Sequence, residues 1–156
     1  MSVKSDVELM RQIPLFADVD PSHLQVLLFS SARRSIGTGE RLMDMGERGD
    51  CAYLVLGGTA QAFGEDREHP VALIERGAFL GELAMVARLE YPFTVIAASE
   101  MSVREIGHDV FVRLCREFPE SAQRILESVA GKLSMTLEHF KEVQVLFDQA
   151  KSFRRL

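Results

Sequence analysis

The segment Gly81-Glu82-Leu83-Ala84-Met85-Val86-Ala87-Arg88-Leu89-Glu90-Tyr91 carries the most specific signal for the fold of this chain. Its Gly-Glu-Leu-Ala turn follows three apolar residues, 78–80, and opens a short apolar stretch. Glycine lets a backbone approach a ligand closely, and free N–H groups at the start of a helix attract an anion. A carboxylate repels a phosphate but accepts hydrogen bonds from sugar hydroxyls. The segment therefore predicts a turn that binds a sugar phosphate.

Short apolar or alternating runs flank this turn on both sides, and glycines separate them. The expected strands cover residues 52–56, 59–63, 71–74, 94–98 and 101–106. The polar residues 64–70 read as the tip of a hairpin. Several short strands with regular turn signals are typical of an all-β sandwich or barrel. The middle of the chain is therefore predicted to be a β-domain.

Helices are expected before and after the β-domain. Residues 5–30 are predicted to be helical, with Asp20 as an N-cap and Pro21 at the first helical position. A short helix is expected over residues 109–117, and Pro119 is expected to start a long helix that ends at about residue 152.

The long C-terminal helix carries an apolar seam whose members alternate three and four residues apart. The seam consists of Leu126, Val129, Leu133, Thr136, Phe140, Val143 and Phe147. Such a heptad pattern predicts a parallel homodimer, with the polar Thr136 meeting its mate across the seam. The alternative is a helix that lies on its own β-domain and buries the stripe within one subunit.

Four motifs in this order carry a family resemblance. They are Ile13-Pro14-Leu15-Phe16, the loop 46–50, the strand-turn-strand run 53–60 and the approach to the glycine turn, 76–84. From Ile13 to about Val110 the chain resembles the cyclic nucleotide-binding domain, a family that includes bacterial catabolite activators and regulatory subunits of the cyclic-AMP-dependent kinase. The resemblance implies a mainly β fold with flanking helices. This fold is a double-stranded β-helix (jelly roll) with an N-terminal helix and a long C-terminal helix. We expect residues 1–156 to form one domain, with the roll over about 35–106 and the C-terminal helices over about 108–152.

The resemblance also implies a ligand site in the roll. Residues Gly81, Glu82, Leu83 and Ala84 would face the ribose-phosphate, and the base would pack against Val71 and Ala72. Glu82 has an alternative role, which is to satisfy N–H groups at the start of the short helix after the turn. Pro92 and the residue before it occupy positions that finish the phosphate contact.

One residue departs from the family pattern. In the kinase-type turn an arginine ten residues after the first glycine pairs with the cyclic phosphate, and this chain has Tyr91 there. The tyrosine either stacks on a ligand or fills the pocket. Arg88 is a possible substitute cation, and its alternative is a solvated surface arginine.

Composition narrows the functional classes. Apolar residues make up 47% and charged residues 26% of the 156 residues, as in ordinary globular domains. No apolar run approaches the ~20 residues that span a membrane, and the N-terminus lacks a secretion signal, so we expect a cytoplasmic protein. The two cysteines, Cys51 and Cys115, are expected to be buried free thiols.

Several activities are not expected. No Ser-His-Asp spacing, metal-ligand cluster or phosphate loop of the Walker type is present, so we expect neither an enzyme nor a metal site. A net charge of −5 argues against nucleic-acid binding. Activator-type relatives carry a helix-turn-helix after their long helix, and this chain stops at Leu156, so DNA binding is expected only if the chain is a piece of a longer regulator.

These observations predict a ligand-sensing regulatory domain that takes a cyclic nucleotide, cAMP or cGMP, with a weak or altered ligand preference and no bound cofactor. The alternative is a dimerisation or scaffold module that works without a ligand because its pocket is plugged.

Overall fold

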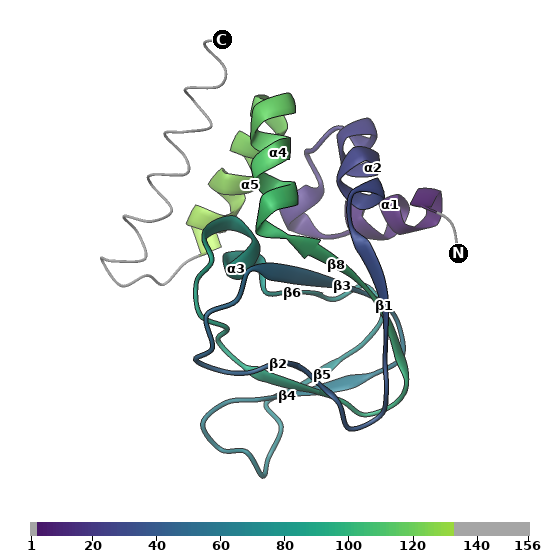
Figure 1. Cartoon of the computed structure of the whole chain (residues 1–156), viewed down its shortest axis with the longest axis vertical. Helices are drawn as coiled ribbons and strands as arrows, with labels where there is room; N and C mark the ends of the chain where they lie inside the picture. Colours follow the sequence, from purple (N-terminus) through teal and green to yellow (C-terminus); the bar gives the residue numbers. More distant parts are fainter. Residues whose placement is uncertain (1–2, 133–156) are drawn as a thin grey trace.

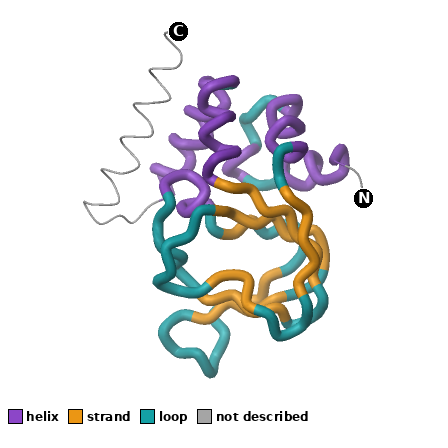
Figure 2. The backbone as a smooth tube through the Cα atoms, viewed as in Figure 1, coloured by secondary structure: helices purple, strands orange, loops and turns teal. Residues whose placement is uncertain are grey.

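Two four-stranded antiparallel sheets face each other and form a β-roll in the computed structural model, which describes residues 3–132 (Figures 1 and 2). The first sheet has the order β1-β8-β3-β6, and its strands are β1 (Ala32–Ile36), β8 (Met101–Gly107), β3 (Cys51–Gly57) and β6 (Phe79–Leu80). The second has the order β2-β7-β4-β5, and its strands are β2 (Arg41–Met43), β7 (Thr94–Ala97), β4 (Ala60–Phe63) and β5 (Ala72–Ile74). The chain has the predicted mainly β jelly roll with flanking helices.

Four α-helices cover the outer face of the first sheet, as Figure 1 shows. They are α1 (Val3–Arg11), α2 (Pro21–Phe29), α4 (His108–Glu117) and α5 (Pro119–Lys132), and a 3-10 turn, η1 (Pro14–Phe16), lies between the first two. A short helix, α3 (Glu82–Ala87), follows β6 at one end of the roll.

Alternation along β3 divides the interior into two cores. Ala52, Leu54 and Leu56 join the core between the first sheet and the helices, whereas Cys51, Tyr53 and Val55 belong to the core inside the roll. Because successive side chains of a strand point to opposite faces, one fully buried strand serves both cores. The same alternation directs Val103 of β8 into the roll and Ile106 toward the helices.

The predicted helical block before the roll is present. Asp20 caps α2, since its side chain accepts a hydrogen bond from the Ser22 amide and Pro21 is the first helical residue. The block consists of three segments, and α1 is separated from η1 because Pro14 favours an extended conformation at Ile13 (φ −85°, ψ 125°). The roll also begins at Ala32, earlier than residue 35.

The first two seam residues lie in the chain's own core. Leu126 and Val129 on α5 are almost fully buried among residues of the helix-covered core. This is the alternative packing for that part of the helix, so a dimer seam would begin after Val129. The other predicted members (Leu133, Thr136, Phe140, Val143 and Phe147) lie outside the described residues.

Within residues 3–132, each helix falls short of the length and apolarity that a bilayer crossing requires. In the same residues, no three side chains of the metal-ligating types gather into a group that could hold an ion.

Candidate functional site

Gly81 makes a left-handed turn at the end of β6 and starts α3. Its φ is 77° and its ψ is 27°, a conformation that glycine adopts without strain. The Gly81 carbonyl accepts hydrogen bonds from the amides of Ala84 and Met85 at 3.0 and 3.1 Å. A Cβ atom at Gly81 would lie 3.0 Å from the carbonyl oxygen of Cys51 on β3. The turn and the short helix predicted from the sequence are therefore present, and the turn is pressed against the central strand of the roll.

The residues after Gly81 separate into three environments. Ala84 is buried in the core of the roll, and Leu83 packs against the helix-covered core. Glu82 is half-buried, and within the described part of the chain its carboxylate makes no hydrogen bond or ion pair. The first amides of a helix have no intrahelical acceptor. The turn thus presents a carboxylate and backbone donors that the described residues do not use.

Tyr91 lies inside the roll, next to the turn. It is 6% exposed, and its hydroxyl donates a hydrogen bond to the carbonyl of Cys51 at 2.9 Å. Its backbone is held by the loop 46–50, because the Tyr91 amide donates to Glu47 O and its carbonyl accepts from the Gly46 amide, both at 3.0 Å. The ring packs on Gly49 and Gly81, where an added Cβ would collide with it. Tyr91 therefore fills the space between these two glycines.

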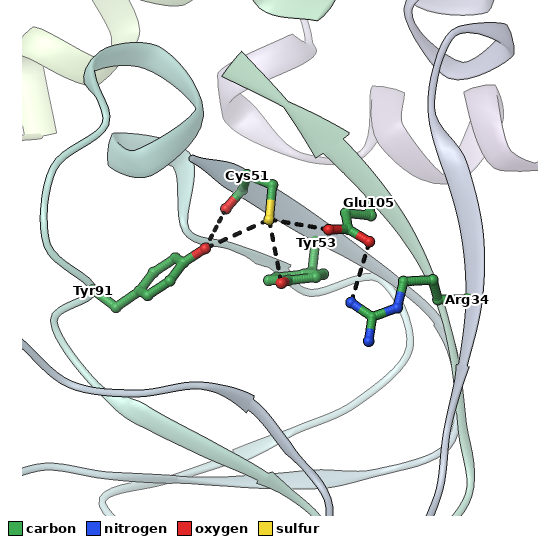
Figure 3. A network of polar contacts seen from close by, with 5 residues as sticks. All are labelled: Arg34, Cys51, Tyr53, Tyr91 and Glu105. Atoms are coloured by element: carbon green, nitrogen blue, oxygen red, sulfur yellow. Dashed lines mark hydrogen bonds and ion pairs between the residues drawn. The ribbon is translucent and has the colours of Figure 1, made fainter. Parts of the chain in front are cut away.

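A chain of polar contacts continues from Tyr91 along the inner wall of the first sheet (Figure 3). The Cys51 sulfur lies 3.6 Å from the Tyr91 hydroxyl, and the thiol donates to the Tyr53 oxygen at 3.2 Å or to Glu105 Oε1 at 3.4 Å. Arg34 Nη1 donates to Glu105 Oε2 at 3.2 Å. The thiol has one proton, so it serves one of its two acceptors at a time.

Burial favours the protonated forms of the thiol and of the two phenols in this network. Desolvation is the main cause that raises the pKa of the Cys51 thiol and the pKa values of the Tyr53 and Tyr91 phenols. Both cysteines are buried and free, as predicted. Arg34, Tyr53 and Glu105 were not among the predicted site residues. The alternation of β3 could have indicated Tyr53, because it shares a face with Cys51 and Val55.

The remaining predicted residues are exposed. Val71 is 59% exposed and Ala72 is exposed on β5, which belongs to the opposite sheet. Pro92 is exposed. Arg88 ends α3 in a left-handed conformation with φ 54°, and it is exposed as well. The structure thus brings Tyr91 to the glycine turn and leaves these four residues on the surface.

Comparisons with known proteins agree with this architecture. The model of the cyclic nucleotide-binding domain family matches residues 33–118. A cAMP-dependent protein kinase regulatory subunit from Aspergillus fumigatus is 30% identical over 105 residues, which make up 67% of this chain and 25% of that protein. A cyclic nucleotide-gated potassium channel from Mesorhizobium japonicum is 29% identical over 116 residues, 74% of this chain and 32% of the channel. The chain therefore spans about a quarter to a third of these two relatives.

A solved structure gives the same result for the fold. A cyclic nucleotide-binding-like protein from Brucella abortus is 30% identical and superimposes with a TM-score of 0.66, covering 72% of this chain and 99% of that one.

Proposed function

Since the chain belongs to the cyclic nucleotide-binding domain family, we propose that it is a ligand-sensing regulatory domain whose roll binds a cyclic nucleotide weakly or with an altered preference. The observation that carries this proposal is the left-handed Gly81 turn, which is pressed against β3 and lies beside the carboxylate of Glu82, a group that no residue within 3–132 pairs with. Such a turn offers backbone donors to a phosphate and an acceptor to a ribose hydroxyl.

The proposed ligand contacts follow the sequence prediction. Gly81, Glu82, Leu83 and Ala84 contact the ribose-phosphate, with Glu82 on the sugar. Val71 and Ala72 pack on the base. The exposed Arg88 and Pro92 lie at the edge of this site. Binding changes the protein only if one arrangement of the turn and the C-terminal helices holds the ligand better than another.

Tyr91 weakens this binding for two reasons. A charge-assisted hydrogen bond contributes roughly 1.5–3 kcal/mol, and tyrosine supplies none to the phosphate. Its absence lowers affinity on the order of 10- to 150-fold. In addition, the ring occupies space beside Gly81 that a ligand needs.

The position of Tyr91 also favours a second candidate, a scaffold or dimerisation module that works without a ligand. A buried ring that is hydrogen-bonded to Cys51 and packed on two glycines is a stable filling of the pocket. In that case the roll is a rigid body, and function lies in the helices.

Titration calorimetry with cAMP and with cGMP separates the two candidates. We expect wild-type protein to give weak heats at ligand concentrations approaching millimolar, and Tyr91→Arg to bind on the order of 10- to 150-fold more tightly. Tyr91→Phe is the matched control, because it keeps the ring and adds no cation. If neither wild-type protein nor Tyr91→Arg binds either nucleotide, the scaffold function is favoured instead.

A further inference from the structure

We propose that Arg34 on β1 binds the negative charge of the ligand's phosphate, in place of a cation on the Gly81 turn. The inference rests on the proposed function, because it names the residue that supplies the positive charge in that same roll. It starts from the polar wall of Figure 3, where Arg34, Glu105, Tyr53 and Cys51 follow one another across three strands of the first sheet.

Arg34 faces the interior of the roll. Ile36, two residues along β1, is buried in the core of the roll, and alternation directs Arg34 to the same face. Its ion pair agrees with this direction, because Glu105 also meets the inward-facing thiol of Cys51. Figure 3 shows the guanidinium pointing into the space between the sheets.

Water reaches this part of the wall. The Arg34 side chain is 47% exposed and the Glu105 side chain is 28% exposed, although both point inward. At the other end of the same wall, Tyr91 is buried and fills the space beside the glycine turn. The wall therefore has a charged, solvated region around Arg34 and a filled region beside the glycine turn.

The Arg34–Glu105 pair is easily exchanged for a phosphate. Solvent-exposed ion pairs contribute little to stability. A guanidinium has five N–H donors in a fixed fork that matches two phosphate oxygens, and within the described residues Arg34 uses one bond, to Glu105. A phosphate that replaces Glu105 gains a bidentate contact, which has to outweigh the repulsion from the displaced carboxylate.

Cys51 links this position to the glycine turn. Its carbonyl lies beside Gly81, and its thiol contacts Tyr53 and Glu105. When the thiol donates to the Tyr53 oxygen, the phenol hydrogen has no acceptor in the described part of the chain and can be donated to an anion. A phosphate lying over Tyr53 and Cys51 therefore has the turn on one side and Arg34 on the other.

The test measures the affinity for cAMP and for adenosine, which lacks the phosphate, by titration calorimetry. We expect Arg34→Met to lower the affinity for cAMP on the order of 10-fold or more while adenosine binds as it does to wild-type protein. Glu105→Gln releases the guanidinium and should tighten cAMP binding several-fold. Arg33→Met, which removes the same charge from the other face of β1, should leave both affinities within about twofold.

Each outcome decides the inference. Unchanged cAMP affinity in Arg34→Met overturns it, as does an equal loss for cAMP and adenosine, which would mark a structural defect. If wild-type protein binds no cAMP, the inference is tested in Glu105→Gln instead. Binding by Glu105→Gln that is lost when Arg34→Met is added supports the role of Arg34. No binding by Glu105→Gln overturns the inference. The proposed function itself is tested separately by Tyr91→Arg.

Discussion

Tyr91 depends on two glycines that lie on different segments of the chain. Gly81 needs glycine for its left-handed turn, but Gly49 has no unusual φ, and any residue could adopt its backbone conformation. What requires glycine at position 49 is the ring of Tyr91, which lies where a Cβ would be. The loop 46–50 and the tyrosine therefore fit each other as a pair.

A double-mutant cycle tests this fit. Gly49→Ala should lower the free energy of unfolding by about 1–3 kcal/mol in wild-type protein, because it overpacks the space that the ring occupies. In a Tyr91→Ala background the added methyl has room, so the same change should cost much less, with a coupling energy of about 0.5–3 kcal/mol. Urea denaturation measures all four proteins. Gly57→Ala is the control, because a Cβ there meets nothing within 4 Å; additive effects at Gly49 and Tyr91 would show that the ring does not lie on Gly49.

At the scale of elements, a buried ion pair fastens the N-terminal helices to the roll. Arg104 on β8 donates from Nε to Asp6 Oδ2 on α1 at 2.7 Å, and from Nη1 to the carbonyl of Leu28 on α2 at 3.1 Å. Asp6 is 1% exposed and the Arg104 side chain 10% exposed. One guanidinium thus joins three elements at a site that is largely shielded from water.

Removing one partner of this pair leaves the other charge buried and unpaired. We expect Asp6→Ala to lower the free energy of unfolding by about 3–5 kcal/mol, measured by urea denaturation. The matched control is Glu8→Ala on the same helix, whose exposed pair with Arg11 at 3.3 Å should contribute no more than about 1 kcal/mol. The double variant Asp6→Ala/Arg104→Met should regain part of the loss. Equal costs for Asp6→Ala and Glu8→Ala would contradict the account.

The strength of the local signal explains which elements the sequence could predict. Strands β3 and β8 have long apolar or alternating runs, and Asp20-Pro21 marks the start of α2, so these were found within a residue or two. Strand β1 was missed because its residues 32–35 do not alternate between apolar and polar types, and all four are exposed. Strands β2 and β6 have only three and two residues, and they are defined by their pairing with β7 and β3.

The features of the site also differ in whether a local stretch of sequence could predict them. The glycine turn and the filling role of Tyr91 were among the predicted alternatives, because both follow from residues near each other in the chain. The pair of Arg34 with Glu105 joins residues that are 71 positions apart. It follows only from the register of β1 on β8, in which Ser35 lies opposite Ser102. No local pattern contains that register.

At the scale of the whole molecule, the buried thiols and phenols make stability fall in alkaline solution. Burial raises the pKa of Cys115 from 9.0 to about 12, and it also raises the pKa of Cys51. The unfolded chain therefore loses these protons at lower pH than the folded protein. The contribution of the buried thiols to the free energy of unfolding is complete below pH 9 and is lost as pH rises toward 12. We expect the free energy of unfolding, measured by urea denaturation, to fall as pH rises from 9.0 toward 12, by up to ~1.4 kcal/mol per pH unit for each such group.

Cys115→Ala is the control for this pH dependence. It lacks one buried thiol, so its stability should fall less steeply with pH, whatever its stability at pH 7. Parallel curves for the variant and wild-type protein would assign the alkaline loss to other groups.

Association is the remaining property of the whole molecule, and it rests on the seam of the C-terminal helix. Leu126 and Val129 are committed to the chain's own core, so a charge there would unfold the protein instead of testing a dimer. Val143 and Phe147 belong to the same heptad pattern and are suited to the test.

We propose that the full chain is a parallel homodimer at micromolar concentration, and we expect Val143→Glu and Phe147→Glu to sediment as monomers with unchanged circular dichroism of the roll. Lys141→Glu changes a residue outside the pattern on the same predicted helix and should leave the dimer intact. A monomeric wild-type chain, or a dimer that survives both seam variants, would assign the apolar stripe to packing within one subunit, as already holds at Leu126.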